Sequence, residues 1–370
     1  MRRPLLGARA TVGFVRTVPH ISYARSADGV SLAFTVAGTG PALVFVPWVP
    51  FSNLRMEWQN PLLRGVFERL SRRLTLIHYD GRGTGHSQRD VADLSLDAMI
   101  SDLEAVVDQV GVAEVSLLGQ YNSCPHAIAY AARHPQRVRR MVLFGGSARG
   151  WNAMSDRQTQ ALLSLIEQDW DLFADSAAHQ WLGWSAAEAG RATADQIRGA
   201  VTPRAARAMM QVASAVDVTE LLPDVAAPTL VVHRAGMPQI PVDVPRSLAQ
   251  DLPRGRLVVL DGAQPTLFGE GTDAAVSMVL DFLCDGVEPA PLPQTASTAA
   301  APDAARTGGL SPRELEVLGL LAAGETNRQI ARRLGLSTHT VERHVANLYR
   351  KIGARGRADA TAYALRNGMA

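Results

Sequence analysis

The chain has 370 residues, of which 47% are hydrophobic and 19% charged, and this composition is typical of a globular protein long enough for two domains. Its two cysteines, Cys124 and Cys284, exclude a disulfide framework and a cysteine-based metal site. No apolar run reaches the ~18 residues that a membrane helix needs. We therefore expect a cytoplasmic protein that uses no metal, no cofactor and no membrane.

The charge is unevenly distributed. Residues 309–370 contain ten basic and five acidic residues, a net charge of +5, whereas the rest of the chain contains 27 basic and 30 acidic residues, a net charge of −3. A basic segment on a slightly acidic body predicts that only the C-terminal segment contacts a polyanion.

The first segment, residues 1–18, contains some apolar residues, but Arg9 and Arg16 interrupt any signal-peptide core. We interpret it as a flexible extension and place the first domain at residues 19–285. Residues 286–308 are rich in proline, alanine and threonine and lack a core-forming pattern, which predicts a linker.

Strand and helix patterns alternate along residues 19–285. Residues 20–37 are predicted to form a hairpin with Asp28-Gly29 at its turn. Short apolar runs, typical of strands buried on both faces of a parallel sheet, follow at 42–47, 74–79, 115–119, 140–144, 229–233 and 257–260. Helical patterns separate them at about 60–71, 95–110, 122–134, 243–251 and 272–284. This alternation predicts a doubly wound α/β domain.

An insertion at about 150–222 has helical periodicity and is predicted to form a cap over the sheet. It holds four of the six tryptophans of the chain, Trp151, Trp170, Trp181 and Trp184. Tryptophans at this density either line a hydrophobic ligand site or pack the cap onto the sheet.

Residues 309–370 are predicted to form a separate all-α domain. Ser311-Pro312-Arg313-Glu314 and Thr326-Asn327-Arg328-Gln329 are capping boxes, each of which predicts the start of a helix. A third helix begins near Thr338, after a tight turn at Gly335. Its apolar face carries Val341, Val345, Leu348 and Ile352. Two short helices that meet at such a turn indicate a helix-turn-helix.

The sequence of residues 309–370 closely resembles the LuxR-family DNA-binding domain, without a gap. The resemblance implies a recognition helix at about 338–352 in the major groove of double-stranded DNA, and a homodimer. The DNA contacts that it implies are Asn327, Arg328, Thr338, His339, Thr340, Glu342, Arg343, Ala346, Asn347, Arg350 and Lys351. The alternative is a helical protein-binding module with a solvated basic face.

Within this family, bases are read mainly at the positions of Glu342, Arg343 and Ala346, and phosphate is held near Asn327, Thr340 and Lys351. Glu342 departs from the lysine that is common in the family. A carboxylate accepts from cytosine N4 but cannot pair with guanine O6 or N7. The preferred DNA site is therefore expected to differ from that of lysine-bearing relatives.

Residues 20–284 resemble the α/β-hydrolases. The loop Tyr79-Asp80-Gly81-Arg82-Gly83-Thr84-Gly85-His86-Ser87 is similar to the DxRGxGxS loop after the fourth strand of that family. The segment LLGQYNSCPHAIAYAARHPQRVRRMVL is similar to its strand–elbow–helix–strand block, and PTLVVHRAG to the strand that leads to the catalytic acid.

The resemblance does not extend to the catalytic residues. An active member has Gly-x-Ser-x-Gly at the elbow, but Tyr121 stands at the nucleophile position and Ser123 at the second glycine. Tyrosine is a poor nucleophile because its phenol stays protonated near neutral pH. The acid position is Met237, and the base position falls at Gln264 or Pro265. We therefore expect the domain not to be an enzyme.

A shifted catalytic set is the alternative. It would use Ser123, Cys124 and His126, with Asp243 or Asp261 as the acid. However, Ser123 and Cys124 are expected to point away from the oxyanion donor at residue 122, and Cys124 and His126 do not share a helix face because they are two residues apart.

A cavity that has lost catalysis can still bind a ligand. The predicted ligand site comprises Trp48, Gln120, Tyr121, Asn122, Trp151, Trp184, Met237 and Gln264. The sequence thus predicts a DNA-binding transcription regulator whose first domain senses a small, largely apolar molecule. Two alternatives remain: an active hydrolase joined to a DNA-binding domain, and a constitutive regulator whose first domain only dimerises, with Tyr121 filling the old pocket.

Overall fold

The structure is a computed structural model and describes residues 18–150, 156–182, 187–237, 240–264, 266–268, 271–284, 312–322, 325–334, 336–352, 354 and 360. The chain divides into two compact units, Met1–Leu292 and Pro293–Ala370. The predicted linker and nearly all of the predicted N-terminal extension lie outside the described residues. Within the described ranges, no helix combines the length and the apolar character required to cross a membrane.

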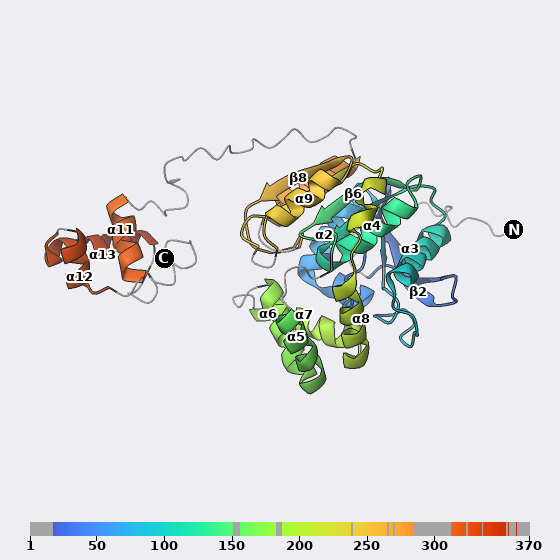
Figure 1. The fold of residues 1–370 in the computed structure, drawn as a ribbon, viewed down its shortest axis with the longest axis horizontal. Helices are drawn as coiled ribbons and strands as arrows, with labels where there is room; N and C mark the ends of the chain where they lie inside the picture. The colour runs from blue at the N-terminus through green and yellow to red at the C-terminus, as the bar shows by residue number, and fades with distance from the viewer. Residues whose placement is uncertain are drawn as a thin grey trace. The chain divides into compact units, whose positions relative to one another are not determined.

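The first unit is built on an eight-stranded sheet with the order β1-β2-β4-β3-β5-β6-β7-β8 (Figure 1). The pairs β1–β2 and β2–β4 are antiparallel, and the remaining pairs are parallel. The strands are β1 (Ser22–Arg25), β2 (Ser31–Ala37), β3 (Ala42–Phe45), β4 (Thr75–Tyr79), β5 (Val115–Gln120), β6 (Val138–Phe144), β7 (Thr229–Arg234) and β8 (Gly255–Leu260). The predicted hairpin and the six predicted apolar strands are thus confirmed.

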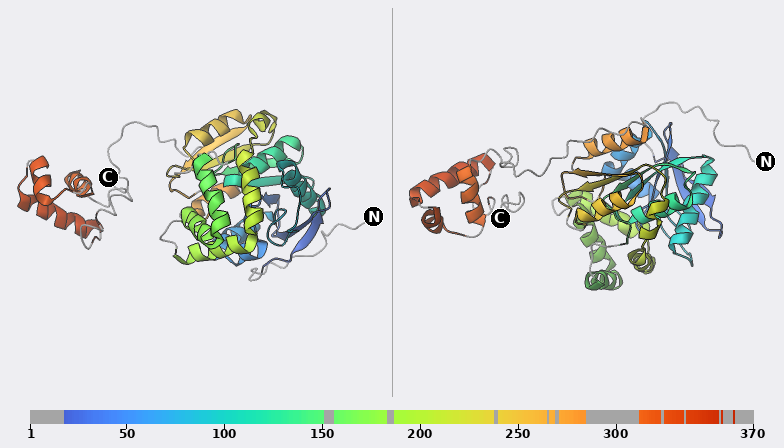
Figure 2. Two further views of the ribbon diagram at one scale, coloured as in Figure 1. Left: turned by 60° about the horizontal axis from the view of Figure 1, so that its bottom comes forward. Right: turned by 45° about the horizontal axis from the view of Figure 1, so that its top comes forward.

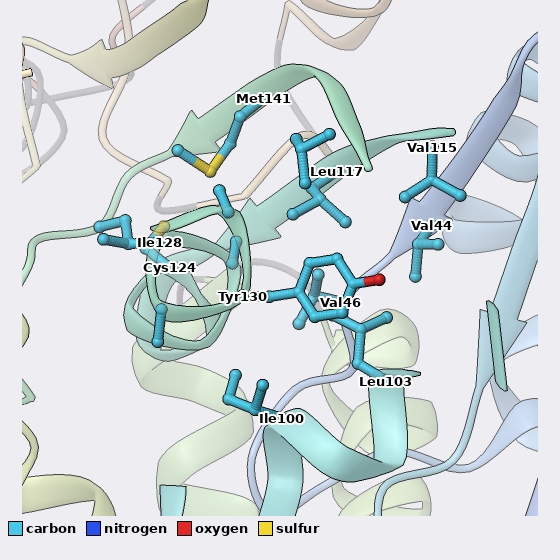
Figure 3. Packing of buried hydrophobic residues seen from close by; sticks show 14 of the residues in the cluster. Val44, Val46, Ile100, Leu103, Val115, Leu117, Cys124, Ile128, Tyr130 and Met141 are labelled. Carbon is cyan, nitrogen blue, oxygen red and sulfur yellow. The ribbon is translucent and has the colours of Figure 1, made fainter. Parts of the chain in front are cut away.

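Helices cover both faces of this sheet. One face packs against α3 (Leu96–Val110), α4 (Cys124–Arg133) and α9 (Asp243–Asp251), and the other against α2 (Pro61–Ser71) and α10 (Thr272–Cys284). Successive strand residues alternate between the two cores because side chains of a strand point to opposite faces. Figure 3 shows the first core, in which Ile100, Leu103, Ile128 and Tyr130 of α3 and α4 meet Val44, Leu117 and Met141 of the strands. This double burial explains the continuous apolar runs of the sequence.

The predicted cap is helical, as expected. It comprises α5 (Asp156–Gln168), α6 (Trp170–Leu182), α7 (Ala187–Ala200) and α8 (Pro203–Ala215), followed by a short 3-10 segment, η2 (Thr219–Asp224). Figure 2 shows these helices grouped together on one side of the sheet. Val49 and Phe51, from the loop between β3 and α1 (Leu54–Gln59), belong to the same hydrophobic core as the cap helices. That loop therefore joins the cap to the sheet.

The second unit contains α11 (Pro312–Ala322), α12 (Asn327–Leu334) and α13 (Thr338–Ile352). Its core includes Ile330 and Ala331 of α12 and Val341, Val345 and Leu348 of α13, as the periodicity predicts. The second capping box is present, because Gln329 N donates to Thr326 Oγ1 and Thr326 N to Gln329 Oε1.

The first predicted capping box begins at Ser311, which lies outside the described residues. The carboxylate of Glu314 accepts a hydrogen bond of 2.7 Å from Lys351 Nζ. Glu314 is buried, and a buried carboxylate is costly without a cationic partner. The bond between Lys351 and Glu314 therefore joins α13 to α11.

A buried arginine connects the β1–β2 turn to helix α3. The guanidinium of Arg82, whose side chain is fully buried, donates to both carboxylate oxygens of Asp102 at 2.8 and 2.7 Å and to Asp28 at 2.8 Å. The Asp102 side chain is 1% exposed, whereas that of Asp28 is 45% exposed. Arg82 and Asp102 thus form a bidentate ion pair inside the domain.

We expect Arg82→Ala to lower the free energy of unfolding of the first unit by about 3–5 kcal/mol, because the Asp102 carboxylate is left buried without a cation. The matched variant Asp28→Asn removes an exposed charge and should cost less than about 1 kcal/mol. Urea unfolding followed by tryptophan fluorescence measures both, since all six tryptophans precede residue 185. Equal losses in the two variants would contradict this assignment.

Candidate functional site

The turn between β5 and α4 displays Tyr121 at the carboxyl edge of the sheet. Strand β5 ends at Gln120, a 3-10 turn, η1, covers Tyr121–Ser123, and α4 begins at Cys124. The φ angle of Tyr121 is 50°, in the left-handed region that a bulky residue rarely adopts. Strained residues of this kind persist only where the surrounding structure holds them.

Four contacts hold the turn. The Ser123 hydroxyl accepts from Gln120 N at 2.9 Å and donates to Gln120 O at 3.0 Å, closing a small ring within the turn. A Cβ added to Gly146 would lie 2.5 Å from Tyr121 O and 2.2 Å from Cys124 Sγ. Only glycine therefore fits where the loop after β6 passes the turn.

The side chain of Gln120 ties the turn to the loop after β8. Its Oε1 accepts from Leu267 N at 2.9 Å, and the residue is 0% exposed. Gln120 was predicted to contact a ligand, but the structure places it inside the protein, where its side chain connects the turn to the loop after β8. The fourth contact is made by Asn122, whose Nδ2 donates to Val49 O in the loop after β3.

A cavity opens beside Tyr121, between the carboxyl ends of the strands and the cap. It holds about 660 Å³ of empty space, part of it open to solvent. Its walls are mostly apolar, as is usual for sites that bind small molecules. The lining residues are Trp48, Phe51, Asn60, Leu62, Leu63, Tyr121, Asn122, Thr193, Gln196, Thr266 and Phe268.

Three of the eight predicted ligand residues, Trp48, Tyr121 and Asn122, line this cavity. Met237 is 4% exposed, and neither it nor the half-buried Gln264 is among the lining residues. Trp151 and the side chain of Trp184 lie outside the described part of the chain.

The other tryptophans of the cap provide little support for a tryptophan-lined site. Trp170 stacks on Phe173 at a centroid distance of 5.2 Å and packs against the cap core. The side chain of Trp181 lies outside the described residues.

The sequence analysis missed eight lining residues, which are Phe51, Asn60, Leu62, Leu63, Thr193, Gln196, Thr266 and Phe268. Thr266 and Phe268 could have been predicted from the sequence, because they lie within four residues of Gln264, at the position where an active hydrolase carries its catalytic base. Phe51 likewise follows the loop that provides Trp48. The residues of α2 and α7 belong to no motif, and only the tertiary packing brings them to the cavity.

The groups of the shifted catalytic set are not arranged as a relay. Ser123 is fully buried and bonded to its own turn, and burial raises the pKa of the Cys124 thiol well above its usual range. His126 Nε2 lies 3.1 Å from Met99 Sδ, and burial lowers the pKa of this histidine to about 4. A histidine with such a pKa is a weak general base near neutral pH. Asp243 and Asp261 are exposed.

Burial also raises the pKa of the Tyr121 phenol. The hydroxyl therefore stays protonated at neutral pH, and it can donate or accept a hydrogen bond in the cavity.

The predicted DNA-reading helix is α13, and its bounds agree with the prediction. Ser337 caps its start, because Thr340 N donates to Ser337 Oγ at 3.1 Å. Exposed predicted contacts are Thr338, Glu342, Arg343, Ala346, Arg350 and Lys351, while Asn327, Thr340 and Asn347 are partly exposed. The side chains of Arg328 and His339 lie outside the described residues.

Two of the basic residues predicted to contact DNA are held in place by bonds within the second unit. Arg350 donates to Asn347 Oδ1 at 2.8 Å, and Lys351 pairs with the buried Glu314. The ammonium of Lys351 is thus fixed at the end of α13, but Glu314 offsets part of its charge.

Comparison with known families divides the chain in the same way. Residues 57–272 match the family described as alpha/beta hydrolase fold, and residues 309–364 match the bacterial regulatory proteins of the luxR family.

Solved structures similar to this chain are hydrolase-fold proteins. A bromoperoxidase from Bacillus anthracis is 19% identical with a TM-score of 0.62, and the match covers 71% of this chain and 99% of that one. An enol-lactonase from Burkholderia xenovorans LB400 is 22% identical with a TM-score of 0.61, over 71% of this chain and 99% of that one. An esterase from Rhodococcus sp. ECU1013 is 23% identical with a TM-score of 0.61, over 71% of this chain and 98% of that one. At these identities the likeness shows the fold alone.

Proposed function

This chain belongs to the alpha/beta hydrolase fold family and ends in a luxR-family regulatory domain, and we propose that its hydrolase-fold domain binds a small, largely apolar ligand without hydrolysing it. Ligand binding then controls how the second unit binds DNA. The observation that carries this proposal is the apolar cavity beside Tyr121, at the position where a hydrolase would present its nucleophile.

The loss of catalysis is supported at three places. The nucleophile position holds a protonated phenol, the acid position holds the buried Met237, and the loop after β8 offers Leu267 N to Gln120 rather than an imidazole to the cavity. Each of these groups lacks the proton-transfer chemistry that ester hydrolysis requires. The strained turn, which costs stability, has nevertheless kept its geometry.

Control of DNA binding requires that the ligand prefer one arrangement of the protein over another. A ligand that bound the DNA-competent and incompetent states equally would shift nothing. We propose that the active form is a homodimer, because domains with this recognition helix read paired half-sites. The ligand would then change how readily the two recognition helices reach both half-sites.

A constitutive regulator with a filled pocket is the main competing function. Tyr121 lines the cavity together with residues from the cap and from α2, so its side chain leaves an apolar opening between them. That space favours a ligand-binding domain over a scaffold that serves only dimerisation.

The cavity should bind the neutral, largely apolar dye Nile red, whose fluorescence rises and shifts to the blue in an apolar site. Thr193, on the cap side of the cavity, is 7% exposed. Thr193→Phe should weaken dye binding at least about tenfold, because the ring fills the space that the dye would occupy.

The matched control is Leu172→Phe, which adds a ring at a cap position that is 51% exposed. It should bind the dye like the parent protein. If the parent binds no dye, or if both variants bind it equally well, the cavity is not a ligand site. Circular dichroism of both variants reports whether the cap has kept its helices.

Arg343→Ala should weaken binding to a DNA site selected from a random pool by about 1–3 kcal/mol and relax base choice at one position, because Arg343 is exposed on α13. Arg343→Lys keeps the charge but loses the bidentate contact, so it should lose specificity while retaining affinity for random DNA. Fluorescence anisotropy at fixed salt measures both variants. Equal losses on selected and random DNA would overturn the assignment of Arg343 to base reading.

A further inference from the structure

One acceptor in the wall of the cavity has no partner. Gln196, on the cap helix α7, is 3% exposed and lines the cavity. Within the described part of the chain, its side-chain oxygen Oε1 is shielded from solvent and accepts no hydrogen bond. A buried amide oxygen without a hydrogen bond destabilises the protein, so a ligand that supplies a donor to it gains affinity.

The orientation of this amide is fixed by chemistry. The other end of the group, Nε2, donates to the carbonyl oxygen of Phe51 at 3.4 Å. A carbonyl oxygen can only accept, so the nitrogen must face Phe51 and the oxygen must point the other way. The contact therefore leaves Oε1 as the available acceptor of a residue that lines the cavity.

The remaining walls limit the charge of a ligand. The cavity is lined by no Asp, Glu, Lys, Arg or His among the residues described, and the polar side-chain groups of its lining residues are amides, hydroxyls and the indole N–H of Trp48. A charged molecule would lose its hydration without gaining an ion pair. Trp48 and Phe268 line the same cavity and pack edge to face, with ring centroids 5.6 Å apart and an interplanar angle of 66°, so they provide an aromatic part of its wall.

We propose that the cavity takes a neutral molecule with an apolar body and one N–H or O–H donor, and that Gln196 Oε1 accepts this donor while the body lies against Trp48 and Phe268. This inference rests on the ligand-binding role proposed above and adds the chemistry that selects the ligand. Thr193 lies three residues before Gln196, on the same face of α7, and it offers a hydroxyl beside the acceptor.

Such a ligand would connect two parts of the first unit. Its donor would bond to a cap helix, and its body would pack on residues from the loops after β3 and β8. Occupancy would therefore tighten the cap against the sheet. Because the ligand would make these contacts only when the cap lies against the sheet, it would shift the equilibrium toward that conformation.

The test uses indole and benzofuran, two bicyclic molecules of nearly the same shape, of which only indole carries an N–H donor. Each is used to displace Nile red from the full-length protein. The parent should prefer indole by on the order of tenfold, because benzofuran leaves Gln196 Oε1 unsatisfied. Gln196→Leu should abolish the preference and bind benzofuran at least as well as the parent does.

The control Gln211→Leu makes the same substitution at an exposed position of the neighbouring helix α8 and should keep the preference. If the parent binds Nile red but indole and benzofuran displace it equally well, this inference is wrong and the ligand-binding role stands. A parent protein that binds no Nile red would overturn both. Because the parent alone decides between these results, the test holds even if Gln196→Leu does not fold.

Discussion

The left-handed backbone of Tyr121 is the constraint on which the candidate site depends. A bulky residue at a φ of 50° is unfavourable, and it is held here by the Ser123–Gln120 ring, by the close passage of Gly146 and by the bond from Leu267 to Gln120. These contacts come from β5, from the loop after β6 and from the loop after β8. The end of the parallel sheet thus fixes the direction in which Tyr121 points.

The same contacts explain how the turn has kept its shape with a changed sequence. Serine at the second glycine position is accommodated because its hydroxyl bonds to the backbone of its own turn. The side chain of Gln120 accepts a hydrogen bond from Leu267 N. Leu267 lies in the loop after β8, which carries the catalytic base in active hydrolases of this fold. In both cases a polar side chain makes a structural hydrogen bond, Ser123 within the turn and Gln120 to the loop after β8.

Much of the architecture was predictable from the sequence because it follows from periodicity. Apolar runs with strand length gave the order of strands and helices, and the spacing of Val341, Val345 and Leu348 gave the buried face of α13. The elbow was predictable because its position is set by a local motif. The replacement of the nucleophile by Tyr121 could be recognised for the same reason.

The walls of the cavity were less predictable, for a physical reason. Gln196 and Thr193 lie in an insertion without motifs, and only the packing of the cap brings them opposite Trp48. Gln120 was assigned to the ligand site because it neighbours Tyr121, but adjacent residues at a strand end point to opposite sides. The bond between Lys351 and the Glu314 carboxylate was not predictable either, because it joins α13 to α11 through tertiary packing.

The central claim is that the hydrolase-fold domain binds a molecule and does not hydrolyse it. The most direct measurement is incubation of the purified full-length protein with a fluorophosphonate probe and with short-chain aryl esters, beside an active hydrolase of the same fold. The account predicts no labelling and no turnover above buffer. Labelling that maps to Ser123 or to a neighbouring residue, with ester turnover, would show that a nucleophile survives and would contradict it.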